Sequence, residues 1–273
     1  MARPLVLPLA AITLLCACQQ MQSTDSGTVG VTRTQRMSYL IPEDQVLRTA
    51  DEAYGATLDK DLDAGILNTD PQLSGRVERI AYRLIHQVGT FRQDATLWHW
   101  EVNVETNDAF AAYCAPGGKV LVDSGVVTTL SLSDDELAAL LAHEIAHALR
   151  NHMREKLSMA QLPTMAAQMV NAATGGKHQD AIAGALKLAD QAYNSPFSPV
   201  QEGEADAMGL ELAARAGFDP AAAVTLWLKI EQTKAPSGPS FLNLHPTTDA
   251  RITAIQALLP KVQPLYDGAR QSR

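Results

Sequence analysis

The hydrophobic positions of this chain repeat mostly with the period of an α-helix. Apolar residues recur three and four positions apart over several stretches, most clearly over 71–88, so that one face of each predicted helix is apolar. Proline or a capping residue opens several of these stretches, and Gly217 closes one. The pattern predicts helices over residues 42–67, 71–88, 125–130, 133–149, 199–216, 220–229 and 246–259.

Two stretches change to the alternating pattern of β-strands. Residues 97–105 alternate and are rich in aromatic and β-branched side chains, and residues 119–123 form a second, shorter stretch. Gly117 and Gly118 predict a turn just before this second strand. We therefore predict an α+β fold that is mostly helical, with a small antiparallel sheet beside the helix over 133–149.

Residues 154–193 remain helical in composition, but Pro163 and the pair Gly175-Gly176 interrupt them. Their apolar runs are shorter than the roughly 20 residues that a helix needs to cross a bilayer. This pattern predicts a helical hairpin or lid.

One predicted helix carries candidate metal chemistry. Ser133 and Glu136 form a capping box at its start, and His143, Glu144 and His147 then make an H-E-x-x-H pattern. Residues four apart share a helix face, so both imidazoles can reach one metal ion, with Glu144 beside its open side as a base for water. The pattern also occurs by chance, but burying these polar groups is costly unless they are paired or coordinated.

A catalytic zinc needs a third protein ligand and one open position for water. Arg150 and Met153 stand where a metzincin would have its glycine and its third histidine, which excludes that class. His152 lies five residues beyond His147 and turns away from the metal, so we interpret it as structural.

Better candidates for the third ligand lie in the helix that begins after Ser198. Glu202 and Asp206 are four residues apart on one face, whereas Glu204 points elsewhere. One carboxylate can bind zinc while the next accepts the N–H of a ligand histidine and fixes its tautomer. The alternative is an acidic helix start that complements the helix dipole, and without the H-E-x-x-H pattern that alternative would be preferred.

Composition and charge narrow the class of protein. The 273 residues are 46% hydrophobic and 19% charged, which is typical of a globular protein. The net charge of −8 and the lack of a basic stripe argue against nucleic acid as a partner.

The N-terminus has the pattern of a targeting segment. Arg3 precedes an apolar stretch over residues 5–15 that is too short to span a bilayer. The following Leu15 to Cys18 (LCAC) resembles a bacterial lipobox, which implies cleavage before Cys18 and acylation of Cys18. Gln19 after this cysteine favours the outer membrane by the enterobacterial sorting rule. A plain secretory signal is the alternative.

These features predict four segments: a lipoprotein signal peptide over 1–17, a flexible polar tether over 18–36, a metallopeptidase domain over 37–262 and a loose tail over 263–273. Of the three cysteines, only Cys114 would remain free in the domain, and a lone thiol forms no internal disulfide.

Several motifs in order resemble metallopeptidase family forty-eight, the group of the CAAX prenyl protease, HtpX, the mitochondrial protease Oma and BepA. They are H-E-I-A-H at 143–147, E-G-E-A-D-A-M-G-L at 202–210, G-F-D-P at 217–220 and H-P-T-T-D-A-R-I at 245–252. The resemblance runs from about residue 40 to 259 and, with the lipobox, is greatest to LoiP-like lipoproteins. It implies a zincin-like metalloprotease domain.

The resemblance also implies roles for individual residues. His143, His147 and Glu202 would be the protein ligands of one Zn²⁺ per chain. Glu144 would be the general base, and Asp206 the carboxylate behind a ligand histidine.

The late motif implies supporting roles for His245 and Arg251. His245 could donate a hydrogen bond to the oxyanion, approach zinc as a fourth ligand in a resting state, or cap the last helix.

Residues 113–119 resemble the family's N-A-F-x-x-P-G-G segment, an edge strand beside the cleft. The resemblance implies that an extended substrate adds to this edge near Gly117, Gly118, Lys119 and Val120. Ala111 replaces the asparagine of that segment, so any contact from its amide is missing.

We therefore predict a zinc-dependent endopeptidase of the bacterial cell envelope. It would be lipid-anchored, face the periplasm at the outer membrane, and cleave unfolded or extended polypeptides in protein quality control. One alternative is a zincin-like chaperone or outer-membrane assembly factor without essential proteolysis, with envelope assembly proteins as partners. Glu144 argues against it, since a binder needs no base beside the metal. A structural zinc protein is a second alternative, but three obvious ligands leave the site open.

Overall fold

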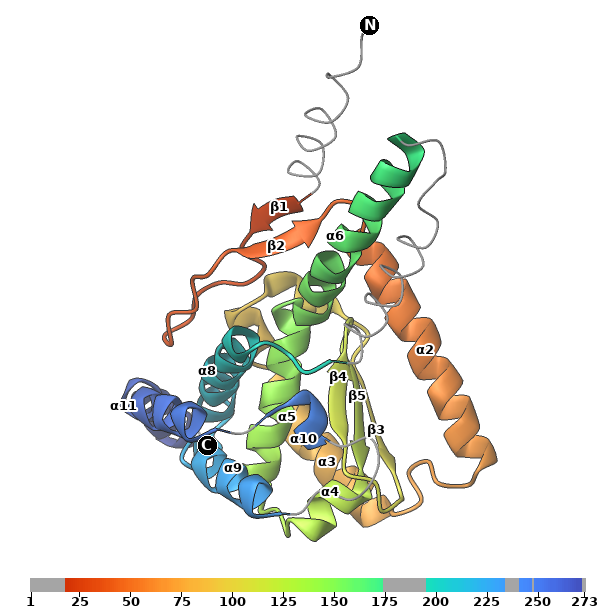
Figure 1. Ribbon diagram of the computed structural model, residues 1–273. Helices are drawn as coiled ribbons and strands as arrows, with labels where there is room; N and C mark the ends of the chain where they lie inside the picture. The colour runs from red at the N-terminus through yellow and green to blue at the C-terminus, as the bar shows by residue number, and fades with distance from the viewer. Residues whose placement is uncertain (1–17, 174–194, 234–240, 247, 272–273) are drawn as a thin grey trace, which may run out of the picture.

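The helix with the H-E-x-x-H pattern lies at the centre of the fold. In the computed structural model, which describes residues 18–173, 195–233, 241–246 and 248–271, this helix is α5 (Asp134–Leu149). Ser133 caps it through the predicted capping box, and its residues from Glu136 onward are all buried. Figure 1 shows α5 between the sheet on one side and α8 (Pro199–Arg215) and α9 (Ala222–Gln232) on the other.

The sheet beside α5 has three strands in the order β3 (Glu101–Glu105), β5 (Lys119–Asp123), β4 (Ala112–Ala115). β4 runs antiparallel to β5, but β3 runs parallel to it. The sheet is therefore mixed rather than wholly antiparallel. β5 is the second strand of the β4–β5 hairpin, and it also pairs with β3. Sequence alternation predicts strands but carries no information on which neighbours run parallel.

The predicted turn at Gly117-Gly118 is confirmed, and it requires glycine. Both residues adopt positive φ, +87° and +86°. A Cβ atom on Gly118 would also lie 2.7 Å from the ring of Trp100, so this position has no room for a side chain.

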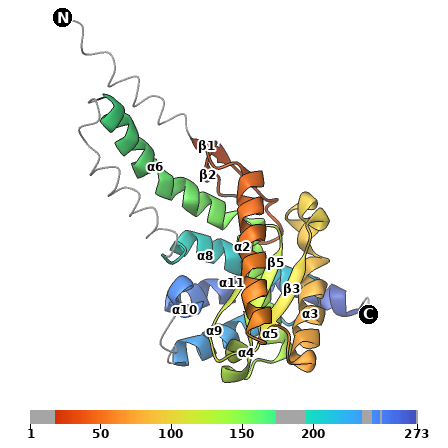
Figure 2. The ribbon, with the colours of Figure 1, turned by 90° about the vertical axis from the view of Figure 1, so that its right-hand side faces the viewer.

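Two helices cover the sheet from different sides. α3 (Pro71–Ile85) buries its apolar face in the core, as its spacing predicts. α2 (Glu43–Asp63) lies along the sheet on the side that faces the viewer in Figure 2. The Tyr54 hydroxyl of α2 donates a hydrogen bond to the Val120 carbonyl of β5, 2.8 Å away.

Three short helical elements lie between α3 and α5 in the sequence. The strand predicted over 97–105 is shorter than expected, because residues before Trp98 form a 3₁₀ turn. The short elements are η1 (Val88–Thr90), η2 (Gln93–Leu97) and α4 (Ser124–Thr129).

The C-terminal part of the fold differs from the sequence prediction at two places. α6 (His152–Ala173) continues through Pro163 without the predicted break, and residues 174–194 of the predicted hairpin lie outside the described residues. After α10 (Phe241–Leu244), α11 (Asp249–Gln271) includes almost all of the region predicted to be a loose tail. Val262 is fully buried, and Leu265 and Tyr266 pack against the core, so the tail is held by apolar contacts.

The polar segment predicted to be a flexible tether is also ordered. β1 (Cys18–Met21) and β2 (Gln35–Ser38) form an antiparallel pair beside α6, and Val29 and Val31 between them are buried. The prediction from composition is wrong here because the polar side chains of this segment bind partners far away in the sequence. Its Ser23 hydroxyl, for example, donates to the Arg150 carbonyl at 3.1 Å.

Within the described part of the chain, none of the helices combines the length and the apolar character that crossing a membrane requires.

Candidate metal centre

Four buried side chains from distant parts of the sequence converge on one point. α5 provides His143 and His147, α8 provides Glu202, and the residue after α10 is His245. One nitrogen or oxygen atom of each lies within 4.8 Å of the corresponding atom of every other. The arrangement therefore brings His143, His147 and Glu202 together and adds His245 to them.

Four of the separations between these atoms, 2.9–3.5 Å, lie near those expected around one tetrahedral metal ion. Nε2 of His143 lies 3.1 Å from Nε2 of His147 and 3.2 Å from Nδ1 of His245. Glu202 Oε1 lies 2.9 Å from that Nδ1 and 3.5 Å from Nε2 of His147. Zinc bonds of about 2.0–2.2 Å in tetrahedral geometry put neighbouring ligand atoms about 3.3–3.6 Å apart. The donor set of imidazoles and a carboxylate is also one that zinc prefers.

Asp206 and Arg251 hold this group from behind. Asp206 Oδ1 lies 3.0 Å from Nδ1 of His143, the nitrogen that faces away from the cluster. Arg251 donates through Nε and Nη2 to both Asp206 oxygens, at 2.5 and 2.8 Å, and its Nη1 lies 2.7 Å from Glu202 Oε2. One guanidinium therefore fixes two carboxylates, and its planar fork suits such a bidentate contact.

Aromatic rings form the walls of the cluster. Trp227 of α9 meets the His143 ring edge-on and also lies under the Arg251 guanidinium, 3.6 Å from it. Phe241 stacks on the ring of His245 at a centroid distance of 4.4 Å, and Phe197 lies 4.2 Å from that of His147. These contacts restrict the rotation of the imidazoles and keep the group out of bulk water.

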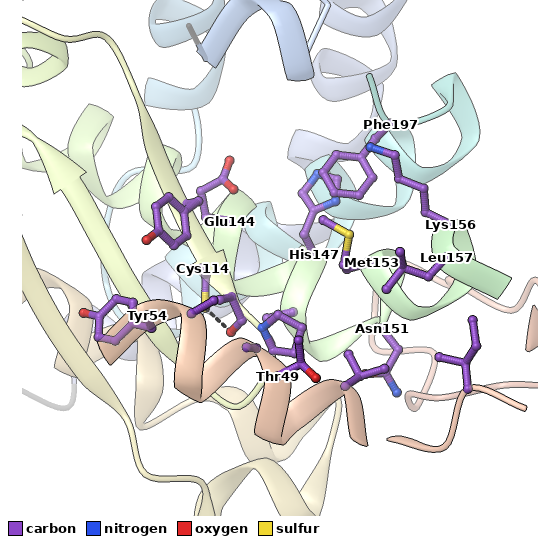
Figure 3. A pocket seen from close by; sticks show the side chains of 18 of the residues that line it. Thr49, Tyr54, Cys114, Glu144, His147, Asn151, Met153, Lys156, Leu157 and Phe197 are labelled. Atoms are coloured by element: carbon purple, nitrogen blue, oxygen red, sulfur yellow. Dashed lines mark hydrogen bonds between the residues drawn. The ribbon is translucent and has the colours of Figure 1, made fainter. Parts of the chain in front are cut away.

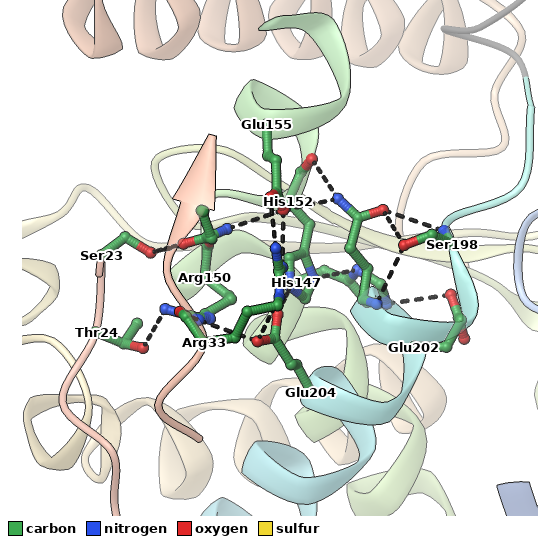
Figure 4. A network of polar contacts seen from close by, with 12 residues as sticks. Ser23, Thr24, Arg33, His147, Arg150, His152, Glu155, Ser198, Glu202 and Glu204 are labelled. Carbon is green, nitrogen blue, oxygen red and sulfur yellow. Dashed lines mark hydrogen bonds and ion pairs between the residues drawn. The ribbon is translucent and has the colours of Figure 1, made fainter. Parts of the chain in front are cut away.

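His152 lies on the far side of His147, which sequence reasoning missed. Its Nδ1 is 2.9 Å from Nδ1 of His147, and its Nε2 is 3.1 Å from Glu204 Oε2 (Figure 4). His152 begins α6 after Asn151 turns the chain with a positive φ of 54°, and this turn brings the side chain back toward α5. Spacing along a single continuous helix could not predict that contact.

Glu144 faces a cavity of about 540 Å³ (Figure 3). The cavity is mostly apolar and extends between α5, α2, β4 and the start of α6. Glu144 Oε1 is buried and finds no hydrogen-bond partner among the described residues, and Nε2 of His245 lies 3.5 Å from it. An unpartnered buried carboxylate oxygen beside a metal-binding cluster is suited to holding a water molecule.

The edge strand along this cavity is β4, not the strand that follows the glycine turn. Lys119 and Val120 lie in β5, the central strand, while Gly117 and Gly118 form the turn. The prediction that an extended substrate adds near Val120 is therefore wrong in its position, because both edges of β5 are already paired. Among the described residues β4, which contributes Tyr113, Cys114 and Ala115 to the cavity, is an edge strand of this sheet.

Burial and charge set the protonation of the carboxylates. Burial raises the pKa of Glu144, which suits a group that must take up a proton. Burial also opposes the ionisation of Glu202, but hydrogen bonds from His143, His147 and His245 outweigh it and hold the pKa of Glu202 well below its usual range. Glu202 is therefore an anion, the form in which a carboxylate can bind a metal ion.

Comparisons with known proteins agree with this geometry. The chain is 34% identical over 168 residues to mitochondrial metalloendopeptidase OMA1 of Schizosaccharomyces pombe, covering 60% of this chain and 48% of that protein. It is 29% identical to human metalloendopeptidase OMA1, covering 60% and 33%. It is also 27% identical over 247 residues to the beta-barrel assembly-enhancing protease of Yersinia pestis, covering 82% and 49%.

The chain thus spans half the length of these relatives or less. The model of peptidase family M48 matches residues 69–259, which include α5, α8 and every residue of the cluster. The chain has a cluster that can bind a metal ion, a carboxylate beside this cluster, and a match to the family model over most of its length. It therefore belongs to peptidase family M48, a family of metallopeptidases.

Proposed function

We propose that this protein is a zinc-dependent endopeptidase of the bacterial cell envelope that cleaves unfolded or unassembled polypeptides. The observation that carries the proposal is the buried Oε1 of Glu144, which has no hydrogen-bond partner among the described residues. It lies beside the His143, His147, Glu202 and His245 cluster, at the wall of an accessible cavity. The two relatives named beta-barrel assembly-enhancing protease support the envelope assignment.

His143, His147 and Glu202 would hold the zinc ion, which supplies a Lewis acid that activates water and polarises the scissile carbonyl. Glu144 then takes a proton from the attacking water and passes it to the leaving amine. Asp206 and Arg251 keep His143 and Glu202 in place throughout, since both contact the cluster from behind.

The form of the cavity favours an extended chain as substrate. β4, an edge strand among the described residues, can pair with the backbone of a bound peptide, so that recognition depends on the main chain rather than on the sequence. Apolar walls from Ile41, Val46 and Leu157 then accept apolar side chains, which folded proteins keep buried. Unfolded or unassembled proteins provide both features.

Digestion of an unfolded protein tests the proposal directly. Purified protein should cleave unfolded casein, lose this activity with a chelator and regain it with Zn²⁺, while the metal content measured alongside should be one zinc per chain. A fully zinc-loaded protein that leaves casein intact would instead favour the alternative, a chaperone or assembly factor without essential proteolysis.

His245 is expected to restrain the activity. Its Nδ1 occupies the fourth corner of the cluster and its Nε2 faces Glu144, so in this conformation it blocks the position that water needs. We expect His245→Ala to raise the rate of casein cleavage with zinc retained. A fall in kcat of roughly 10²–10³-fold would instead identify an oxyanion donor. An unchanged rate with a lower melting temperature would leave only a helix-capping role.

The lipid anchor would be on Cys18, the first residue of β1. We expect Cys18→Ser to move the protein from the membrane and detergent phases into the aqueous phase, because the acyl chains provide the membrane affinity. Cys16→Ser is the matched control, since Leu15 precedes Cys16 where a lipobox has a small residue, and it should remain membrane-bound. Membrane association of the Cys18 variant would point to a different anchor.

A further inference from the structure

Arg33 joins the N-terminal segment (residues 18–38) to the outer shell of the metal centre. Its guanidinium contacts two carboxylates of the metallopeptidase domain. Nη1 and Nη2 donate to Glu155 of α6 at 2.7 and 2.9 Å, and Nε and Nη2 donate to Glu204 of α8 at 3.0 and 2.7 Å. Both carboxylates are buried, whereas the Arg33 side chain is 33% exposed.

The contacts continue from Glu204 to a residue of the cluster. Glu204 Oε2 is 3.1 Å from Nε2 of His152, whose Nδ1 is 2.9 Å from Nδ1 of His147. Figure 4 shows the chain Arg33, Glu204, His152 and His147 in one view, with Arg33 entering from the side of the N-terminal segment. The opposite ring nitrogen of His147, Nε2, is the atom that faces the cluster.

This chain of contacts has one consistent arrangement of protons. If Nε2 of His147 binds a metal, its Nδ1 carries a proton and must donate it. Nδ1 of His152 is then the acceptor, so Nε2 of His152 carries the proton that Glu204 accepts. An anionic Glu204, held by Arg33, therefore favours the tautomer of His147 that presents a free Nε2 to the cluster.

A second arginine makes Glu204 the centre of this network. Arg150 Nη2 lies 3.0 Å from Glu204 Oε1 and also donates to the Arg33 carbonyl. Gln35 of β2 donates through Nε2 to the Arg150 carbonyl at 2.6 Å. The N-terminal segment thus binds Glu204 directly through Arg33 and holds the other arginine that binds it.

We propose that Arg33 is a positioning residue of the metal centre, and that docking of the N-terminal segment completes the outer shell of His147. The inference rests on the metal site of the proposed function. It extends that site to a segment outside the residues that match the family model, which begin at 69. The segment that follows the proposed lipid anchor is therefore part of the site rather than a passive connection.

The test compares two arginines of this segment in the full chain. Arg33→Met removes the contacts with Glu204 and Glu155, whereas Arg36→Met removes the same charge from an exposed side chain only three residues away. With Zn²⁺ and a competing chelator, well below the melting temperature of each variant, we expect Arg33→Met to bind zinc roughly tenfold more weakly. This is the lower end of the range for outer-shell partners. Arg36→Met should bind zinc as the wild type does.

A double variant separates positioning from general stability. If Arg33 acts through His152, adding Arg33→Met to His152→Asn should weaken zinc binding no further than His152→Asn alone. Effects that add in full, or wild-type zinc affinity of Arg33→Met, would overturn the proposal.

Histidine spectra of the metal-free protein keep the test independent of metal binding and proteolysis. Arg33→Met should shift the ring ¹⁵N signals of His152 and His147, and Arg36→Met should leave them unchanged. Unchanged signals in Arg33→Met would equally overturn the positioning role. If the wild-type protein bound no zinc at all, that result would count against the proposed function, and the histidine signals would still test this contact.

Discussion

Glu144→Gln should keep its metal and its fold but lose peptide hydrolysis by about 10²–10⁴-fold, the usual contribution of one general base. The substitution preserves the volume and one oxygen of the side chain but removes its ability to take up a proton. Because Glu144 Oε1 makes no hydrogen bond to any described residue, and its contact with Nε2 of His245 is as long as 3.5 Å, the substitution should disturb the fold little. The effect should therefore appear in kcat, with the melting temperature and the metal content close to those of the wild type.

The control removes a carboxylate from the same helix without approaching the site. Asp134 lies exposed at the start of α5, where it pairs with Arg76 on the surface. Asp134→Asn should retain full activity, because an exposed ion pair contributes at most about 1 kcal/mol. If Glu144→Gln cleaved casein at a near-normal rate, another group would be the base and the proposed mechanism would be wrong.

The parts of the fold that were predicted correctly are those whose signals are local. The capping box at Ser133 and the helical spacing after it predicted α5 to within a residue, and a second capping box did the same for the start of α8. The Gly117-Gly118 turn was equally clear, since only glycine adopts its backbone angles without strain.

The parts that were predicted incorrectly depend on contacts between distant residues. The composition of the segment before residue 37 predicts disorder, yet Arg33 binds carboxylates that lie more than 100 residues away in the sequence. His152 stays outside the cluster, as helix periodicity predicts, but the positive φ of Asn151 brings its ring against His147, and helix spacing did not predict that contact. The edge strand predicted over 113–119 includes most of β4, but the predicted point of substrate addition near Val120 lies in the central strand β5, because strand order in a sheet is not encoded in alternation.

His245 shows how far sequence reasoning extends at the site itself. Its motif indicated a role near the cluster but left three alternatives open. The distance of 2.9 Å from its Nδ1 to Glu202 Oε1 gives it the position of a fourth ligand. A closed set of four ligands is typical of structural zinc. Catalysis is favoured by the cavity and by Glu144 Oε1, which has no hydrogen-bond partner in the described part of the chain.

The largest effect on the metal itself is expected from the ligands His147 and Glu202. Replacing either by Ala should weaken zinc binding by more than the roughly 10–100-fold that outer-shell partners cost, because a direct bond to the ion is lost. Under limiting zinc, each variant should therefore retain little metal and no casein cleavage. His86→Ala is the matched control, since this exposed histidine of the same chain lies outside the cluster and should keep one zinc.

The two variants should also differ from each other in stability. His147→Ala leaves Nδ1 of His152 without its partner, but it removes no charge. Among the described residues, Glu202→Ala leaves Asp206 as the one remaining ion-pair partner of the buried Arg251, and it removes the anion that faces three histidines. We expect the metal-free Glu202 variant to melt at the lower temperature, because a buried cation that loses a partner costs more than a neutral ring that loses one. Full zinc occupancy in either variant would show that this residue is not a ligand.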